Sequence, residues 1–495
     1  MKNRTAGNNI VIIGAGLGGL SAGILLSRLQ FNVTIVEKNR LPGGLMRSYR
    51  RAGVECPVGV HYVGALGAEE PLGKMFRFLG VNAADLFERT GQDGIIDRYI
   101  FDDFTFDLPA GIDNYENNLL AFFPGDAVAV RIIMRNLRDI AQSMFQPSFL
   151  INQGDPFRNI DYFTPLGEYL RRLNVSRDLQ AVLAVPAQLI GVPAELCPII
   201  FHHMVLAGYL FSCWRLKENG SCMTDAFVRR FAELGGKLIL NDAVTEIMHT
   251  DRKIAGLKLK SGGKLPAAAV VAAIHPKALL GLIAPQAMRD SFRERVLHLQ
   301  ETEGVIVAQI SVDAAAHREL PHNIYRLHTD ETGAISDGIF YQLRRGDTDK
   351  VNLLSIITKS LFADWLPWEK TQSGARGAEY VHKKTVLAEA MLRKASDLFG
   401  GMLDAHLVDV FTPLTVRDYV NCPEGSCYGV MHSSRQLMKI ASLNNIPLSG
   451  LYLAGQNVVA PGVFGTMLGS FNAARQIIGA ERLTKELNAI EKQTG

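Results

Sequence analysis

Hydrophobic residues near both ends of the chain occur in short runs that alternate with helical patterns. Residues 10–13 and 33–36 are apolar runs that predict two strands, and the apolar residues between them recur at helical spacing. Near the other end, residues 450–455 predict a strand that leads into a glycine turn, and residues 466–481 predict a last helix. This alternation of strands and helices is typical of a parallel α/β sheet.

The middle of the chain contains several stretches in which apolar and polar residues alternate. Residues 94–108 follow this pattern and predict a β-hairpin with its turn at Asp102-Asp103. Well-spaced strand-like stretches predict an antiparallel sheet, and they cover residues 304–313, 323–328, 336–344 and 351–358. Helices are predicted at 224–234 and 379–399, and further strands at 237–240, 244–248, 254–259 and 269–274.

These patterns predict an α/β fold in which a Rossmann-like nucleotide-binding domain is interrupted by an inserted α+β domain with an antiparallel sheet. A chain of 495 residues is long for one hydrophobic core, which also favours two domains. We expect the nucleotide-binding domain to comprise residues 1–93, 219–290 and 405–495. The inserted domain, which we expect to receive the substrate, comprises residues 94–218 and 291–404.

Three glycines, Gly14, Gly16 and Gly19, lie between the first strand and the first helix, and Glu37 follows the second strand. In the dinucleotide fingerprint, the first glycine makes a tight turn, the second lets the backbone approach a pyrophosphate, and the third lets the helix pack on the strand. The acid accepts a hydrogen bond from a ribose hydroxyl. Free N–H groups and the dipole at the helix N-terminus favour the phosphates. The N-terminal segment is therefore predicted to bind a dinucleotide.

Two apolar stretches lie in the predicted inserted domain. Residues 115–150 have a helical, amphipathic pattern, and its apolar side is predicted to carry Val128, Ile132, Ile133, Leu137 and Ile140. Residues 179–214 are strongly apolar but are interrupted by prolines, which argues against a membrane span. Either this second stretch forms two buried helices, or it is the wall of an apolar tunnel or a surface that dips into a membrane. Periodicity does not distinguish these alternatives.

Composition and charge exclude several classes of function. The net charge is +3, and basic residues form no cluster with interleaved aromatic residues, so no nucleic-acid partner is expected. The six cysteines form no Cys-x-x-Cys pair, so neither a disulfide framework nor a zinc site is expected. His202 and His203 diverge by about 100° on a helix and have no nearby partner motif, so no metal site is predicted there.

The apolar stretch of residues 10–29 has the length of a membrane span, but it contains five glycines and the dinucleotide fingerprint. We therefore expect neither a signal peptide nor a transmembrane helix there, and the expected location is cytoplasmic. A mean hydropathy of +0.09 is slightly high for a soluble enzyme and is compatible with peripheral membrane contact. The oligomeric state is not predicted.

Glycine-containing motifs are spread over nearly the whole chain. They are the 14–20 fingerprint, the Gly43-Gly44 loop, the Gly-Gly-Lys segment at 235–237, and the C-terminal motifs at 450–456 and 462–467. Further motifs are Gly-Val-His-Tyr-Val-Gly at 59–64, Ala-Ile-His-Pro at 273–276, and residues 412–419, followed by Gly425 and Tyr428-Gly429. Together they resemble the FAD-dependent amine oxidase and phytoene desaturase superfamily. The closer resemblance is to its carotenoid isomerase and retinol saturase branch.

This resemblance implies that the cofactor is FAD and that matching positions bind it. Gly14, Gly16, Gly19 and Glu37 would hold the ADP half, and Val244 would hold adenine through its backbone. The side of the pyrophosphate and the flavin would be formed by Gly43, Gly44, Ser48, Gly455, Gly465, Thr466 and Met467. A helix N-terminus at 465–467 would stabilise the anionic reduced flavin.

The chain departs from the superfamily pattern at three positions. Leu45 replaces the usual arginine after Gly-Gly, Pro57 replaces an acid ahead of Gly59, and Gln456 replaces an acid after Ala-Gly. Each replacement removes a charge from the expected surroundings of the flavin.

The resemblance implies an oxidoreductase that desaturates, saturates or isomerises C=C bonds of a hydrophobic polyene. His61 and Tyr62 are the candidates for proton transfer or substrate alignment, although they could equally pack under the flavin. Arg417 and Tyr419 are candidates for the pocket, and Arg417 could equally form a structural ion pair. The alternatives are a flavin amine oxidase and a non-redox prenyl-lipid carrier that resembles the Rab GDP-dissociation inhibitors.

Overall fold

A computed structural model describes residues 8–153, 157–218, 220–402 and 404–494. Its first layer is a five-stranded parallel sheet in the order β10-β2-β1-β14-β20. The strands are β1 (Asn9–Ile13), β2 (Asn32–Val36), β10 (Lys237–Ile239), β14 (Ala269–Ala272) and β20 (Leu451–Leu453). Three separate parts of the chain therefore build one sheet, as the sequence predicts for the Rossmann-like fold.

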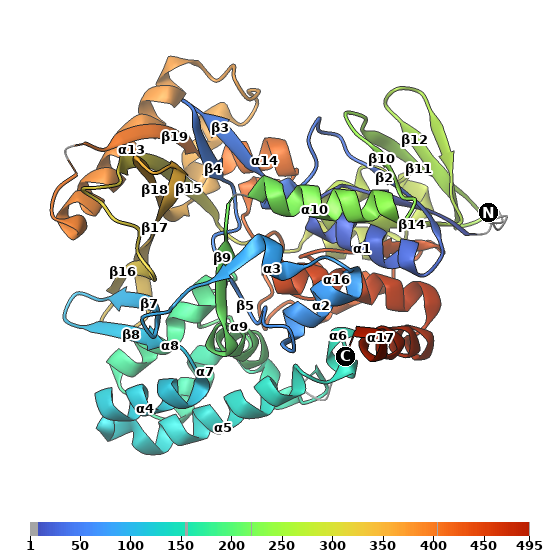
Figure 1. The fold of residues 1–495 in the computed structure, drawn as a ribbon. Coiled ribbons are helices and arrows are strands. Elements are labelled where there is room, and N and C mark those ends of the chain that lie inside the picture. Colours follow the sequence, from blue (N-terminus) through green and yellow to red (C-terminus); the bar gives the residue numbers. More distant parts are fainter. Residues whose placement is uncertain (1–7, 154–156, 219, 403, 495) are drawn as a thin grey trace.

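Three long helices pack together beside this sheet: α1 (Leu17–Arg28), α10 (Gly220–Glu233) and α16 (Gly462–Ile478). Helix α1 lies between the other two and contacts both of them (Figure 1). Eleven of the twelve residues of α1 are buried. An antiparallel sheet of β11 (Val244–Thr250), β12 (Lys253–Leu259) and β13 (Lys264–Pro266) lies next to the N-terminal strands.

The second main layer is a seven-stranded sheet in the order β19-β15-β18-β17-β16-β7-β8, in which only β16 and β7 are parallel. The central strands bury residues on both faces, because helix α13 (Gly377–Phe399) packs on this sheet. The strand bounds are β7 (Ile95–Ile100), β8 (Thr105–Pro109), β15 (Gly304–Asp313), β16 (Asn323–Thr329), β17 (Ile335–Thr348), β18 (Val351–Ser360) and β19 (His406–Phe411).

Most of the remaining helices form a layer below the hairpin β7–β8 and along α16 (Figure 1). They are α2 (Pro71–Leu79), α3 (Ala83–Leu86), α4 (Ile112–Phe122), α5 (Ala127–Ser143), α6 (Pro147–Leu150), α7 (Leu166–Arg172), α8 (Arg177–Gln188), α9 (Ile199–Phe211) and α17 (Ala480–Thr494). Elsewhere lie α11 (Pro276–Leu280), α12 (Asp290–Leu297), α14 (Pro413–Val420), α15 (Leu437–Ala441), and the short strands β3 (Ser48–Arg51), β4 (Val54–Pro57), β5 (Val63–Gly64), β6 (Phe87–Arg89) and β9 (Cys213–Leu216).

One detail of the predicted pattern is wrong. Residues 115–150 are mainly helical, as predicted, but Val128 is 73% exposed whereas Leu137 is buried. Nine residues at about 100° each place these two side chains on opposite faces of α5. By contrast, the apolar stretch 179–214 contains two buried helices, α8 and α9, as one of the two interpretations predicted.

Strand pairing also differs from the predicted domain boundaries. Strand β19 lies in the expected nucleotide-binding segment 405–495, yet it pairs with β15 of the seven-stranded sheet. Strand β9 lies in the expected segment 94–218, yet it pairs with β5 and β6 of the first segment. The chain therefore crosses between the two layers at points that local patterning does not mark.

Glycines allow the two ends of the chain to pack in backbone contact. A Cβ atom on Gly19 would lie 1.9 Å from the Gly14 carbonyl oxygen, which explains the third glycine of the fingerprint. A Cβ on Gly18 would lie 2.7 Å from Gly455 Cα, and one on Gly469 would lie 2.3 Å from Gly455 O. In addition, Ser470 Oγ of α16 donates a hydrogen bond of 2.8 Å to the Gly18 carbonyl of α1.

Gly469→Ala is therefore expected to lower Tm, because the added methyl group collides with the Gly455 carbonyl. Overpacking of this kind destabilises by about 1–3 kcal/mol or more, which exceeds the small gain in helix propensity from alanine. Gly125→Ala is the control, because Gly125 is exposed and a methyl group there would meet no atom within 4 Å. Equal Tm values for Gly469→Ala and the wild type would contradict the close helix contact.

Candidate functional site

One large cavity lies between the five-stranded and the seven-stranded sheet, with an empty volume of about 2170 Å³ that includes solvent at its mouth. One wall is rich in glycine and consists of Gly16, Leu17, Gly18, Gly43, Gly44, Ala454, Gly455, Gln456, Gly462 and Thr466. The turns from both ends of the chain therefore meet at one cavity.

The glycine-rich wall offers backbone rather than side chains to a ligand. Gly43 N donates to the Ala15 carbonyl at 2.8 Å, which joins the Gly43-Gly44 loop to the start of α1. Both loop glycines have positive φ, 110° and 58°, which other residues rarely adopt. A Cβ on Gly44 would lie 3.3 Å from Gly16 Cα, so side chains would fill this cradle. The first N–H groups of α1 have no partner within the helix and are suited to phosphate oxygens.

Glu37 lies at the end of β2, buried and directed at the first glycine turn. Its Oε2 accepts a hydrogen bond from Ala15 N at 2.8 Å, and its Oε1 accepts from Asn39 N and Asn39 Nδ2 at 2.9 and 2.8 Å. A carboxylate has about four acceptor sites, so the position retains capacity for a ribose hydroxyl. These contacts fit the predicted role of Glu37 at the adenosine end of the cofactor.

Two other predicted cofactor residues, Val244 and Ser48, lie near the site but do not line the cavity. Val244 begins β11, two residues after Asp242, whose N–H donates to the Glu37 carbonyl at 3.1 Å. Ser48 Oγ accepts from Gly220 N at 2.7 Å and thereby caps α10, so it supports the site rather than lining the cavity.

The helix at the C-terminal motif begins earlier than predicted, at Gly462 rather than near Gly465. Residues of its first turn, Gly462, Val463 and Thr466, line the cavity, so the helix N-terminus does face it. Gly465 packs against the Ala460 carbonyl, where a Cβ would lie 2.2 Å away, and Met467 is fully buried. A helix start three residues earlier rotates Met467 into the core. It is also not the last helix, because α17 follows.

Arg417 and Tyr419 do not reach the cavity. The Arg417 guanidinium donates to the Glu369 carbonyl at 2.6 Å and to Asp418 Oδ1 at 2.8 Å, which is the ion-pair alternative. Tyr419 is 44% exposed, and its ring lies 5.3 Å from the Arg47 guanidinium. The face of α14 that lines the cavity instead carries apolar side chains, Val416 and Val420.

His61 and Tyr62 do line the cavity, in an aromatic wall with Phe340 and Tyr325. The Tyr62 and Phe340 rings are stacked at 6.1 Å, and His61 meets the edge of Phe340 at 5.7 Å. Burial, together with the charge of Arg344, lowers the pKa of His61 to about 4, so this imidazole is neutral at pH 7. Its Nδ1 is buried and has no hydrogen-bond partner among the described residues.

A buried polar network lies directly behind this wall, and the sequence did not indicate it. Tyr62 OH donates to Asp97 Oδ2 at 3.1 Å and lies 2.7 Å from Tyr325 OH. Asn323 Nδ2 donates to Asp97 Oδ1 at 2.9 Å, and Gln342 Nε2 donates to Asn323 Oδ1 at 3.0 Å. Burial raises the pKa of the Asp97 carboxyl to about 7, although the hydrogen bonds from Asn323 and Tyr62 oppose this shift.

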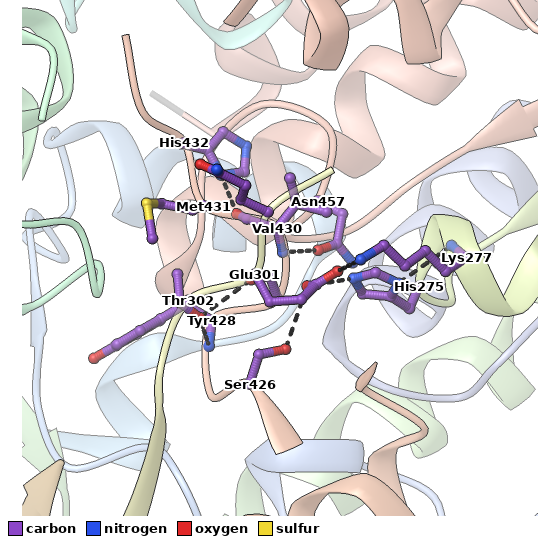
Figure 2. Close-up of polar contacts among 12 residues, drawn as sticks. His275, Lys277, Glu301, Thr302, Ser426, Tyr428, Val430, Met431, His432 and Asn457 are labelled. Carbon is purple, nitrogen blue, oxygen red and sulfur yellow. Dashed lines mark hydrogen bonds and ion pairs between the residues drawn. The ribbon is translucent and has the colours of Figure 1, made fainter. Parts of the chain in front are cut away.

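A second buried cluster holds the C-terminal side of the cavity (Figure 2). Glu301 Oε2 accepts from His275 Nε2 at 2.9 Å, and Glu301 Oε1 pairs with Lys277 Nζ at 2.8 Å. His275 Nδ1 accepts from the Lys277 N–H, so its Nε2 carries the proton. These partners lower the pKa of Glu301 despite its burial. The cluster joins the end of β14 to residues 426–432, which contribute Cys427, Tyr428 and Met431 to the cavity.

The remaining wall is mainly apolar, although Glu303 and Lys359, which form an ion pair at 3.2 Å, also line the cavity. It includes the segment between α8 and α9, at Gln188, Leu189, Gly191 and Pro193, so the stretch 179–214 is both a buried helix pair and part of a cavity wall. The seven-stranded sheet contributes Val305, Val307, Leu327, Ile335, Ile357 and Phe411.

The three departures from the superfamily pattern introduce no charge here. Leu45 and Gln456 line the cavity, whereas Pro57 is buried behind it and its carbonyl accepts from Gln309 Nε2 at 3.1 Å.

The remaining candidates from the sequence are the cysteines, the pair His202 and His203, and the apolar helices. All six cysteines are free thiols, and no group of His, Cys, Asp and Glu that could hold a metal ion occurs within the described ranges. His202 and His203 contact each other, with their Nδ1 atoms 2.8 Å apart. Within the part of the chain that the structure describes, no helix combines the length and the apolar character needed to cross a bilayer.

The chain belongs to the family of flavin-containing amine oxidoreductases, whose sequence model matches residues 17–478. This membership confirms the predicted flavin cofactor and the predicted oxidoreductase class. The glycine cradle, the two helix N-termini and Glu37 fit such a cofactor.

The sequence identity between this chain and individual relatives is low. The chain is 21% identical to an all-trans-retinol 13,14-reductase of Danio rerio, over 94% of this chain and 85% of the relative. It is 25% identical to an all-trans-zeta-carotene desaturase of Myxococcus xanthus, over 97% and 93% of the two chains. The solved structure of cyclohexylamine oxidase from Brevibacterium oxydans has the same fold, with a TM-score of 0.60, 17% identity and coverage of 98% and 99%.

Asp97→Asn is expected to make stability less dependent on pH. The pKa of Asp97 rises from 3.8 to about 7 on folding, so between these values the unfolded chain releases a proton that the folded protein retains. The free energy of unfolding therefore falls as pH rises through this interval, by up to about 1.4 kcal/mol per pH unit from this group. Denaturant unfolding at pH 5, 6 and 7 should show a flatter dependence for the variant, and an unchanged slope would contradict the assigned burial.

Proposed function

We propose that this protein is an FAD-dependent oxidoreductase that acts on C=C bonds of a hydrophobic, polyene-like substrate. Two observations support the proposal. Relatives that align over more than nine-tenths of this chain include proteins named for retinol reduction and for carotene desaturation. The wall opposite the glycine cradle is built from aliphatic and aromatic side chains of two layers, which suits a long apolar molecule.

Bound FAD supplies the hydride chemistry at its N5 atom. The protein's own residues bind the cofactor and orient the substrate. Gly16, Gly43 and Gly44 would present their backbone to the pyrophosphate, and Glu37 would accept a hydrogen bond from a ribose hydroxyl. The first turn of α16 directs its N–H groups and its positive dipole end toward the flavin side of the cavity, which favours the anionic reduced form. The apolar wall excludes water from the reacting carbons.

His61 and Tyr62 are proposed to act at the reacting end of the substrate. A neutral imidazole has one donor and one acceptor nitrogen, and the His61 ring lines the cavity. The Tyr62 hydroxyl lies in a hydrogen-bonded chain and is therefore suited to proton transfer.

The amine oxidase alternative has less support at this site. The aromatic residues of the C-terminal segment that an amine cage would need are Phe464 and Phe471. Phe464 stacks on Phe149, Phe471 packs on Phe78, and neither residue is among those that line the cavity.

Anaerobic flavin spectroscopy distinguishes these functions. With all-trans-retinol, the dithionite-reduced FAD protein should be reoxidised while the absorbance of the polyene falls. With all-trans-zeta-carotene, the oxidised FAD protein should lose its flavin absorbance as the flavin is reduced. Cyclohexylamine should change neither form. Reduction by the amine and by no polyene would indicate an amine oxidase, and a protein that cannot be loaded with FAD would indicate a lipid carrier.

We also propose peripheral contact with a membrane, where such a substrate would dissolve. On α4 and α5, Phe122 is 49% and Val128 is 73% exposed, and the exposed Arg131 and Arg135 follow on α5. Apolar side chains with adjacent cations suit an anionic bilayer surface.

Flotation with phosphatidylglycerol liposomes tests this contact. Val128→Asp should reduce the bound fraction about tenfold, because it removes the buried apolar area of one side chain and adds a negative charge. Met438→Asp is the control at a residue that is 84% exposed on α15. Equal binding of both variants and the wild type would count against α5 as the contact.

A further inference from the structure

We infer that Asp97, Tyr62 and Tyr325 form a proton relay that connects a buried carboxyl to the substrate cavity. The relay runs from Asp97 Oδ2 to Tyr62 OH at 3.1 Å and on to Tyr325 OH at 2.7 Å. Asp97 is 1% exposed, whereas both tyrosines line the cavity. This inference rests on the proposed function, because it names further residues for the same site.

The amide network behind Asp97 fixes which oxygen carries the proton. Gln342 Nε2 donates to Asn323 Oδ1 at 3.0 Å and to the His61 carbonyl at 3.1 Å, so Asn323 must direct its Nδ2 toward Asp97. Asp97 Oδ1 accepts that amide hydrogen at 2.9 Å. The proton of the neutral carboxyl therefore lies on Oδ2, which faces Tyr62.

The direction of the hydrogen bonds depends on whether this proton is present. When Asp97 is neutral, it donates to Tyr62, Tyr62 donates to Tyr325, and the Tyr325 O–H is left to point into the cavity. When Asp97 is ionised, Tyr62 donates to Asp97, Tyr325 donates to Tyr62, and the Tyr325 oxygen can accept a proton from the cavity. The relay can thus deliver or receive one proton at Tyr325.

The surroundings of Asp97 keep both the neutral and the ionised form of its carboxyl accessible. The ionisable groups that sense its charge are Tyr62, Tyr99, Tyr209, Tyr325 and Cys213, and all are neutral near pH 7 because burial raises their pKa values. They come from β7, β9, β16, α9 and the segment before β5. Two hydrogen-bond donors oppose the effect of burial and hold the pKa of Asp97 at about 7. This value suits exchange of a proton at neutral pH.

The balanced step in the reducing direction is the addition of a hydride and a proton to one C=C bond. A bound reduced flavin would supply the hydride. The Tyr325 O–H bond breaks as the C–H bond forms at the other carbon, Tyr62 then passes its proton to Tyr325, and Asp97 passes its proton to Tyr62. Asp97 is left as a carboxylate, and after product release it regains a proton through the same chain from water that enters the cavity. Desaturation uses each transfer in reverse.

Infrared difference titration of the FAD-loaded protein between pH 5 and 9 tests the buried end of the relay without substrate. The wild type should show a protonated-carboxyl C=O band that disappears with a midpoint of about 7. Asp97→Asn should abolish the band, and Tyr62→Phe should shift its midpoint upward because the carboxylate loses a donor. Tyr99→Phe is the control, because the Tyr99 hydroxyl is buried without a hydrogen-bond partner among the described residues. A wild type without such a band would overturn the inference.

Single-turnover reoxidation of the dithionite-reduced protein by all-trans-retinol tests the cavity end. Asp97→Asn and Tyr325→Phe should each slow this step about 100-fold, the lower range for a lost general acid, and the double variant should be no slower. Both variants should lose the solvent deuterium isotope effect of the wild type. Reoxidation by an artificial quinone, which needs no relay, should change less than about threefold in each variant.

The infrared titration and the single-turnover experiment together distinguish a failure of the relay from a failure of the proposed function. A wild type that shows the titrating band but converts neither polyene supports the buried carboxyl and rejects the proposed substrate class. Polyene conversion that continues at the wild-type rate in Asp97→Asn and Tyr325→Phe overturns the relay and leaves the proposed function intact.

Discussion

The backbone contact between the two ends of the chain is the constraint on which the rest of the structure depends. Gly18 in α1 and Gly469 in α16 both approach Gly455 so closely that neither can carry a Cβ atom. This contact brings the N-termini of two helices to the same cavity, although they lie more than four hundred residues apart in the sequence. A cofactor site made of backbone follows, because the same glycines that permit the contact leave the surface without side chains.

The cavity that this contact organises has two unlike walls. The glycine-rich wall provides N–H groups and helix dipoles, whereas the wall on the seven-stranded sheet is aliphatic and aromatic. Leu45 and Gln456 leave the flavin side without the charges that the superfamily pattern has there. Ionisable groups are instead kept neutral in the wall, as at His61, placed behind it, as at Asp97, or joined in an ion pair, as are Glu303 and Lys359. The fold thus separates electrostatic binding of the cofactor from a dry reaction space that exchanges protons through hydroxyl groups.

Local patterns predicted the parts of this arrangement that depend on local contacts. Gly19 packs against Gly14 five residues earlier, so the fingerprint specified its own geometry, and the strands of the antiparallel sheet followed from alternation. The Asp97 network could not be found this way, since its partners lie 35 residues before it and 226 residues or more after it. Val128 was misplaced because it lies nine residues before Leu137 in α5, and this spacing puts it on the opposite, exposed face of the same helix. The start of α16 was placed too late, because Gly462 and Gly465 in its first turn were interpreted as part of the preceding loop.

The most direct test of these conclusions is an experimental structure of the FAD-loaded protein. We predict the pyrophosphate between the N-terminus of α1 and the Gly43-Gly44 loop, the ribose at Glu37, and the isoalloxazine between Gly455 and the wall of His61, Tyr62 and Tyr325. A flavin bound outside this cavity, or glycine turns that separate from one another when FAD binds, would contradict this prediction.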